Sequence, residues 1–305
     1  MRLLNASGCL DALAAPEVAR TLDAYVTKTV TPLPREGNEP VRIAETDVGM
    51  LNAIGLANPG IEGFLCDHLP RLAELGVPLW VSVGGFSLDD YVEVATRLVG
   101  RDEVETLELN LSCPNVDEVP ENVGDVVAAV RAVTHKPVYA KLSAAVADLA
   151  ATARAAEAAG ADGLSLINTI KGLALDDRTL RPVLSRGAGG LSGPALRPVA
   201  LAAVHACRHA STLPIVGMGG VATGRHALDL LAVGADHVAI GTALFSDPGA
   251  ATRIRSELAA ELAALGFANA DNVAAAAHAA SAVTLDPTSR VVPEKSLHTG
   301  ANLSG

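Results

Sequence analysis

The sequence predicts an α/β protein, a (β/α)8 barrel of the TIM-barrel type, on three observations. Eight short apolar runs alternate with helix-like stretches, which is the pattern of βα units around a parallel sheet. The composition is 50% hydrophobic but only 3% aromatic, which favours a core of Ala, Val, Leu and Ile, as in buried parallel strands covered by helices. The length of 305 residues suits one such barrel with loops inserted at the carboxyl ends of its strands.

The eight apolar runs are expected to form the barrel strands in chain order. They cover residues 3–6, 24–27, 78–83, 106–111, 137–142, 163–167, 214–217 and 237–240. Helices are expected near residue 16, over 61–75, from 88, over 121–133, up to 159, over 195–209 and from 223, with terminal helices over 251–265 and 270–280. An open doubly wound sheet is the alternative arrangement of the same units.

Three segments interrupt this alternation. Residues 32–40 predict a hairpin-like insertion, residues 50–56 an extended segment, and residues 169–193 a long loop rich in Gly, Asp and Arg. A loop of that length in a compact domain is usually a lid or a binding loop. Because no linker interrupts the chain, residues 1–284 are expected to form one domain, followed by a polar tail over 285–305.

Charge and cysteine usage exclude several classes of function. The net charge of −11 argues against nucleic acid and anionic membrane surfaces as partners. The four cysteines are widely spaced, without a CxxC pair, so the sequence predicts neither a metal site nor an iron–sulphur cluster in this chain. It contains no signal-peptide pattern and no apolar run of about 18 residues, so we expect a cytoplasmic protein with reduced thiols.

The stretch Asn110-Leu111-Ser112-Cys113-Pro114-Asn115 is the central candidate for a functional site, because it ends the fourth expected strand. Pro114 prevents simple continuation of the strand ladder. Two carboxamides can bind the amide edges of a planar ring, and a thiol between them can act as a base or a nucleophile if its pKa is lowered. For this stretch alone, a buried cysteine in an ordinary turn is an equally good interpretation.

Glycines after the last two expected strands predict a phosphate site. Gly217-Met218-Gly219-Gly220 follows the seventh run, and Gly241-Thr242 follows the eighth. Glycine lets backbone N–H groups approach a phosphate, and barrels often bind phosphate between these two strands. Two tight turns are the alternative, so the pattern favours a phosphorylated ligand without naming it.

Two of the five lysines lie in apolar, strand-like segments. Lys141 ends the fifth run and Lys28 follows the second. A buried ammonium group is costly unless it faces a ligand or a charged partner. Lys141 is therefore expected to stabilise negative charge, or to form a Schiff base if its pKa is depressed. A lysine that extends to solvent is the alternative.

Asparagines accumulate at the same expected rim. The segments Asn52–Leu56, Asn168-Thr169 and Gly189–Pro194 are each typical of turns when taken singly. With Asn110 and Asn115 they bring four asparagines to the strand ends, which suits a flat anionic ligand with several C=O and N–H groups. The histidines fall in helices, loops, the tail or the wrong end of a strand, so Cys113 remains the candidate acid/base.

In their order along the chain these motifs resemble those of dihydroorotate dehydrogenase, the flavin enzyme of pyrimidine synthesis. The resemblance extends from Ala6-Ser7-Gly8 to Gly241-Thr242-Ala243 and includes the segments 52–56, 110–115, 140–143, 165–169, 189–194 and 217–220. It implies oxidation of (S)-dihydroorotate to orotate in de novo UMP biosynthesis, with Cys113 as the base and FMN as the hydride acceptor.

The resemblance also implies roles for individual residues. FMN would be held by Ser7, Lys28, Thr29, Asn110, Lys141, Ile167, Gly193, Gly219, Gly220, Gly241 and Thr242. Dihydroorotate or orotate would be held by Lys28, Asn52, Ala53, Ile54, Gly55, Leu56, Asn110, Asn115, Asn168 and Thr169. Cys113 would take the proton from C5 while C6 delivers hydride to the flavin, and Lys141 would stabilise the electron-rich flavin.

A cysteine base marks the type 1 enzymes, whereas the quinone-using type has serine and an extra N-terminal segment. Segments 35–40, 49–52, 57–60 and 166–169 are more similar to the NAD-linked type B subclass than to the fumarate-using type A. Type B implies a partner subunit that carries FAD and a 2Fe–2S cluster, in a heterotetramer of two catalytic and two electron-transfer chains built on a homodimer.

Two departures from type B and two rival functions stay open. Ser82 stands where many members have an FMN-contacting Asn, and Lys171 places a charge in a usually apolar stretch. One rival is a Schiff-base lyase acting on a sugar phosphate through Lys141. The other is a flavin- or phosphate-binding module without catalysis. For the dehydrogenase itself, a related dihydropyrimidine is an alternative substrate.

Overall fold

The computed structural model describes residues 1–111, 122–273 and 276–278. Its barrel strands are β1 (Leu3–Asn5), β2 (Tyr25–Val26), β5 (Leu79–Val83), β6 (Val104–Asn110), β7 (Val138–Leu142), β8 (Gly163–Leu166), β11 (Ile215–Met218) and β12 (His237–Ile240). They pair in the order β1-β12-β11-β8-β7-β6-β5-β2, and each pair of neighbouring strands in this order is parallel.

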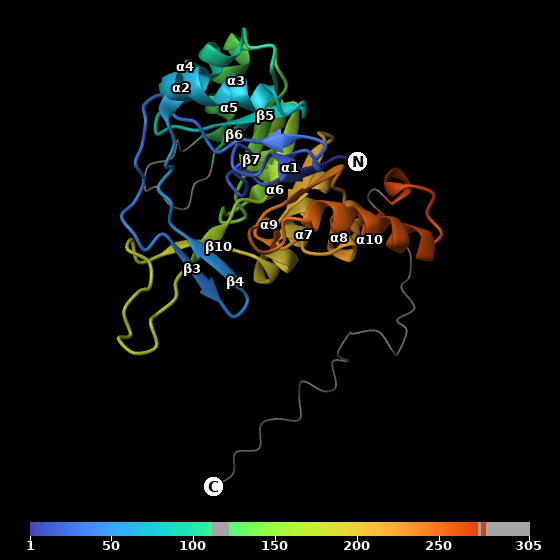
Figure 1. Ribbon diagram of the computed structural model, residues 1–305. Coiled ribbons are helices and arrows are strands. Elements are labelled where there is room, and N and C mark those ends of the chain that lie inside the picture. The colour runs from blue at the N-terminus through green and yellow to red at the C-terminus, as the bar shows by residue number, and fades with distance from the viewer. Residues whose placement is uncertain (112–121, 274–275, 279–305) are drawn as a thin grey trace.

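A parallel bridge between Leu4 and Ala24 joins the two ends of this order, so the strands follow one another around a barrel (Figure 1). The predicted (β/α)8 barrel is therefore confirmed. The open doubly wound sheet is wrong, because it would leave β1 and β2 at opposite edges. The eight predicted apolar runs coincide with the barrel strands to within a few residues.

Helices cover the outside of the barrel (Figure 1). They are α1 (Pro16–Ala19), α2 (Gly60–Gly63), the π-helix η1 (Phe64–His68), α3 (Leu69–Ala73), α4 (Leu88–Leu98), α5 (Val123–Val133), α6 (Leu149–Ala158), the 3₁₀-helix η2 (Pro194–Leu196), α7 (Arg197–Ala210), α8 (Gly224–Ala232), α9 (Ala243–Ser246), α10 (Ala250–Ala264) and the 3₁₀-helices η3 (Ala270–Asn272) and η4 (Ala276–His278). Side chains of Asn122, Asp148 and Thr223 accept backbone N–H bonds at helix starts, which explains where α5, α6 and α8 begin.

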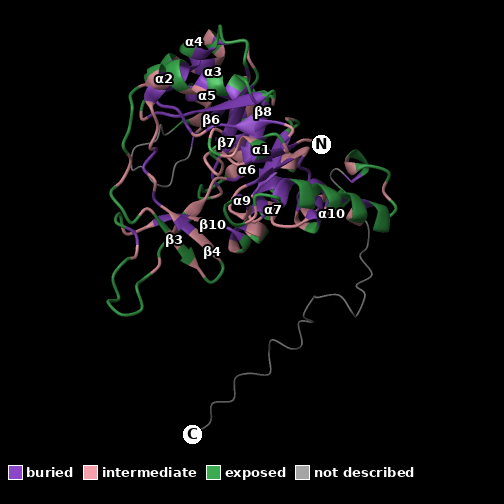
Figure 2. Ribbon diagram, viewed as in Figure 1, coloured by how far each residue is buried: buried purple, intermediate pink, exposed green. Residues whose placement is uncertain are grey.

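The core has two layers that differ in chemistry. Aliphatic side chains fill the space between strands and helices, and burial is concentrated on these facing surfaces (Figure 2). Inside the barrel, Trp80 and Tyr139 pack with ring centroids 4.6 Å apart. Gly163 makes room for them, because a Cβ there would lie 2.2 Å from the Tyr139 ring. Toward the carboxyl ends the buried alternate positions become polar, which prepares a site at that end.

A separate four-stranded antiparallel sheet is built from two excursions of the chain. Its strands are β3 (Ile43–Thr46), β4 (Gly49–Asn52), β9 (Ile170–Gly172) and β10 (Gly189–Ser192), in the order β3-β4-β10-β9. It lies apart from the helical layer in Figure 1. Lys171, a departure noted in the sequence, is exposed on β9. The predicted loop 169–193 thus contains two strands, β9 and β10, and β10 pairs with β4 of a hairpin more than 100 residues away.

Two expectations about these insertions are wrong. The hairpin is formed by β3 and β4, joined at Asp47 and Val48, and not by residues 32–40. Prolines without a donor interrupt that earlier segment, which is held instead by a bridge between Arg35 and Asn58. The extended segment expected at 50–56 is a strand only as far as Asn52.

Two expected helices also differ. The helix over 61–75 is divided into α2, η1 and α3, and Pro70, which lacks an N–H, lies at the start of α3. In place of a helix over 270–280, the described residues form the short helices η3 and η4. Of the described residues in and beside η3, Val273 is the one that is buried, so this segment offers little apolar surface to stabilise a longer helix by packing. Across the part of the chain that the structure describes, no helix is long and apolar enough to cross a bilayer.

Candidate active site

A pocket of about 550 Å³ lies at the carboxyl ends of the barrel strands. It is lined by every residue that the sequence predicted for FMN: Ser7, Lys28, Thr29, Asn110, Lys141, Ile167, Gly193, Gly219, Gly220, Gly241 and Thr242. These residues lie at or after the carboxyl ends of different strands, which the barrel brings together at one face. The residues that the sequence predicted for FMN therefore lie together around one pocket in the folded chain.

Most residues predicted for the substrate line this pocket as well. They are Lys28, Asn52, Ile54, Leu56, Asn110, Asn168 and Thr169. Ala53 and Gly55 do not line it: Ala53 packs with Leu51 and Leu184, and Gly55 lies against Asn38. Cys113 and Asn115 lie outside the described residues.

A chain of hydrogen bonds connects polar side chains around the pocket. Asn168 Nδ2 donates to Asn110 Oδ1 at 3.0 Å, and Asn110 Nδ2 donates to Thr29 Oγ1 at 3.2 Å. Thr29 Oγ1 lies 2.9 Å from Ser82 Oγ. Ser82 is fully buried, so it supports Thr29 from below and is not on the pocket wall. The chain fixes the orientation of the Asn110 carboxamide, because both of its polar atoms are engaged.

Lys141 is paired with a buried carboxylate that the sequence analysis did not single out. Lys141 Nζ lies 3.3 Å from Glu108 Oε1, and their side chains are only 7% and 1% exposed. Both residues point into the barrel from neighbouring strands, and Glu108 lies two residues before Asn110, on the same face of β6. Glu108 holds the ammonium group at the pocket floor and compensates a charge that would be costly alone.

Glycines shape the end of the pocket near β11 and β12. Gly219 and Gly220 have φ values of +128° and +72°, which side chains rarely adopt. A Cβ at Gly219 would lie 2.8 Å from Ala200 Cβ, and one at Gly220 would lie 2.8 Å from Arg197 Cβ. The cradle is therefore specific for glycine, and its exposed backbone suits a phosphate group.

Replacing Gly220 with Ala tests this cradle, with Gly76→Ala as the matched control. Gly76 has almost the same φ, +69°, but a Cβ there meets nothing within 4 Å. The control should lose about 1–2 kcal/mol from left-handed strain. Gly220→Ala should lose about 1–3 kcal/mol more through overpacking, and should also bind FMN more weakly. Urea unfolding and FMN titration measure the two effects, and equal losses in the two variants would contradict a tight cradle.

The four-stranded antiparallel sheet of β3, β4, β10 and β9, called the insert sheet below, forms one wall of the pocket. Asn52 Nδ2 donates to the Gly190 carbonyl at 3.1 Å and supports the β4–β10 pair within the sheet. Thr242 Oγ1, which follows β12, donates to Ser192 Oγ at 2.8 Å and joins the sheet to the barrel. Beyond the sheet, Leu56 has φ +57° although it carries a bulky side chain. Asn58 Nδ2 donates to the Leu56 carbonyl at 2.7 Å and helps hold this strained backbone beside the pocket.

Comparison with known proteins identifies the family. The sequence pattern described as dihydroorotate dehydrogenase matches residues 2–262. A relative from Listeria monocytogenes, the catalytic subunit of dihydroorotate dehydrogenase B (NAD(+)), is 47% identical over 81% of this chain and 84% of its own. The chain belongs to the dihydroorotate dehydrogenase family.

Other similarities agree with this assignment. The protein of the same name from Anoxybacillus flavithermus is 44% identical over 87% of this chain and 88% of its own. The crystal structure of the dihydroorotate dehydrogenase of Eimeria tenella in complex with ferulenol has a TM-score of 0.77 at 22% identity, over 90% of this chain and 85% of that one. It supports the barrel fold. Dihydroorotate dehydrogenases in general depend on FMN.

The sequence did not predict two residues that line the pocket, Cys9 and Arg253, nor Glu108, which lies buried against Lys141. Glu108 was hidden in an apolar strand, although a carboxylate there has the same cost as Lys141. Arg253 reaches the pocket from α10 and is held by Asp247 Oδ2 at 2.7 Å and Glu257 Oε1 at 2.9 Å. Cys9 lies on the pocket wall, where burial raises the pKa of its thiol and the charges of Lys141 and Lys28 offset this only partly.

Proposed function

We propose that this chain oxidises (S)-dihydroorotate to orotate in pyrimidine biosynthesis, as the FMN-binding catalytic subunit of an NAD-linked dihydroorotate dehydrogenase. The observation that carries the proposal is the convergence of all eleven residues predicted for FMN on one pocket in a chain of this family. Residues 1–284 would form the catalytic domain.

FMN fits the described residues by shape and charge. The Gly219–Gly220 cradle and Gly241 would hold the phosphate, because their backbones lie open at the pocket wall. Ser7, Thr29, Asn110 and Thr242 offer hydrogen bonds along its length, while Ile167 and Gly193 offer close apolar contact. When bound, FMN supplies a two-electron acceptor for hydride. Lys141, held by Glu108, would place a positive charge where negative charge develops.

The substrate would lie between this pocket floor and the insert sheet. Lys28 would bind its carboxylate, since few other cations line the wall. The carboxamides of Asn52, Asn110, Asn115 and Asn168 would bind the C=O and N–H edges of the ring. The backbone from Ala53 to Leu56 would cover the ring, and Thr169 would support Asn168. This orientation would present the C5 proton to Cys113.

Cys113 would act as the base in its thiolate form. Cys9, which lines the pocket, keeps its proton near neutral pH because burial raises its pKa. It therefore does not compete for the proton at C5. Removal of that proton and transfer of hydride from C6 complete the oxidation, with two electrons leaving the substrate.

The electrons would pass to NAD through a second subunit. The relatives are named as catalytic subunits of an NAD(+) enzyme, which supports a separate electron-transfer chain and favours NAD over fumarate. That partner would carry FAD and a 2Fe–2S cluster. Two catalytic chains, paired as a homodimer, and two electron-transfer chains would form the heterotetramer, in the cytoplasm.

Anaerobic addition of dihydroorotate to the FMN-loaded chain tests the catalytic proposal. We expect rapid loss of the oxidised flavin absorption and one orotate per FMN. Borohydride trapping of a sugar phosphate on Lys141, without bleaching, would instead establish the lyase, and neither signal would indicate a binding module. Co-purification of an iron–sulphur flavoprotein with NAD-dependent turnover tests the subclass, whereas fumarate turnover by the isolated chain would overturn it.

A further inference from the structure

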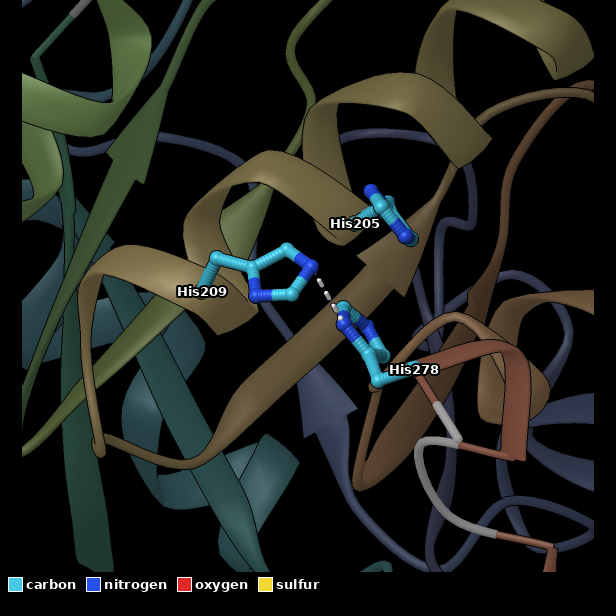
Figure 3. A group of neighbouring side chains, drawn as sticks. All are labelled: His205, His209 and His278. Atoms are coloured by element: carbon cyan, nitrogen blue, oxygen red, sulfur yellow. Dashed lines mark hydrogen bonds between the residues drawn. The ribbon is translucent and has the colours of Figure 1, made fainter. Parts of the chain in front are cut away.

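Three histidines from distant parts of the chain meet on the outside of the barrel (Figure 3). His205 and His209 lie on α7, and His278 lies on η4 near the C-terminal end of the described chain. One ring nitrogen from each lies within 4.8 Å of the others. The three side chains are half-buried or exposed, so an ion from solvent can reach them.

The helix and the C-terminal segment each explain part of this arrangement. His205 and His209 are four residues apart, which places them on one face of α7. His278 lies opposite them: its ring stacks on His205 with centroids 4.2 Å apart, and its Nδ1 lies 2.8 Å from His209 Nε2. Sixty-nine residues separate His209 from His278, so no ligand spacing in the sequence reveals the group.

The tautomer of His278 is fixed by a backbone group. Its Nε2 lies 2.9 Å from the Val233 carbonyl oxygen, which can only accept a hydrogen bond. Nε2 therefore carries the proton, and Nδ1 of the neutral ring presents a lone pair toward His209. Metal-binding histidines commonly donate their second ring N–H to a backbone carbonyl in this way.

A positive charge beside the histidines would oppose the binding of a cation. The adjacent Arg208 is directed elsewhere, because its guanidinium bonds the Gly234 carbonyl at 2.9 Å and Asp236 at 2.5 Å. Its charge is thus neutralised beside the histidines.

We propose that His205, His209 and His278 bind one divalent transition-metal ion, with Zn²⁺ the best match, and that the ion fastens the C-terminal segment to α7. Imidazole suits Zn²⁺, Ni²⁺ and Cu²⁺. Two nitrogens bound tetrahedrally at 2.0–2.1 Å lie about 3.3 Å apart. The His209–His278 pair is already near that separation, and rotation of the His205 ring brings in the third ligand. Water fills the fourth position.

The role of this site is structural. His205 and His209 belong to the last turns of α7, and Val233 follows α8, so the site adjoins the segments that enter β11 and β12. That is the end of the barrel opposite the pocket, and none of the three histidines lines the pocket. In barrels this face serves stability and not catalysis.

Metal titration of the full chain, loaded with FMN and carrying no histidine tag, tests the proposal. After chelator treatment we expect one Zn²⁺ or Co²⁺ per chain, with Co²⁺ absorption typical of nitrogen ligands and without thiolate bands. Zn²⁺ should raise Tm and slow proteolytic cleavage near residue 278. Flavin reduction by dihydroorotate should not change, which separates this site from the proposed activity.

Single variants identify the ligands. His209→Ala and His278→Ala should each weaken Zn²⁺ binding by at least about tenfold. Removing a residue that only hydrogen-bonds to a metal ligand already costs about tenfold in affinity, so removing a ligand should cost no less. The control is His135→Ala, since His135 is exposed in a loop outside the cluster. Equal affinity in all variants, thiolate bands with Co²⁺, or no stoichiometric binding would overturn the proposal. In the last case the rings would form only a hydrogen-bonded contact.

Discussion

Replacing Lys141 with Met is expected to destabilise the folded chain by about 3–5 kcal/mol, because it leaves Glu108 buried without its partner. Glu108 is 1% exposed and cannot turn to solvent, so it must be protonated or the barrel must open locally. The variant should also fail to retain FMN. Urea unfolding without FMN, followed through the single tryptophan, Trp80, inside the barrel, measures the loss of stability.

A second substitution separates the structural from the catalytic role of Lys141. In the double variant Lys141→Met with Glu108→Gln the buried charge is absent, so most of the lost stability should return. Flavin reduction should stay impaired, since no positive charge replaces the ammonium group. If the double variant is as unstable as Lys141→Met alone, the ion pair does not explain the burial of Glu108.

Replacing Cys113 with Ser should slow flavin reduction by about 10²–10⁴-fold near pH 7, the range expected for loss of a general base. A serine hydroxyl is far more weakly acidic than a thiol, so little of the base form is present. FMN and orotate should still bind. Stopped-flow reduction by dihydroorotate across a pH series measures the effect, and the rate of the variant should rise steadily with pH.

The control for this substitution is Cys66→Ser, since Cys66 is exposed on η1, outside the pocket lining. It should reduce flavin at the rate of the unchanged chain. An unchanged rate in Cys113→Ser would remove the thiol from the mechanism. Slowing in both variants would point to a general loss of structure.

Much of the barrel could be predicted because its strands are continuous apolar runs that carry their own signal. Lys141 and the Gly217–Gly220 segment were also recognisable, since a buried charge and a run of glycines each reduce the stability of the fold unless a site requires them. Their positions at strand ends follow from parallel topology alone. Cys113 and Asn115 remain predictions from the sequence.

Features that depend on distant contacts could not be predicted in this way. The β4–β10 pairing joins segments more than 100 residues apart, and neither strand has a strong pattern of its own. Glu108 has no distinguishing feature in the sequence, and only its contact with Lys141 inside the barrel shows its role. The histidine cluster required a position for His278 that no local spacing encodes. In each case tertiary packing decides which side chains meet.

The pairing of β4 with β10 has a consequence for how this pocket can be altered. Met50 and Ser192 are partners across that pair, and a Cβ on Gly49 would lie 2.0 Å from the Ser192 carbonyl oxygen. Neither excursion can change shape by itself. Exchanging only one of the two excursions with that of a relative should therefore distort this wall of the pocket. Exchanging both together should preserve the wall, so the two excursions form a single exchangeable unit.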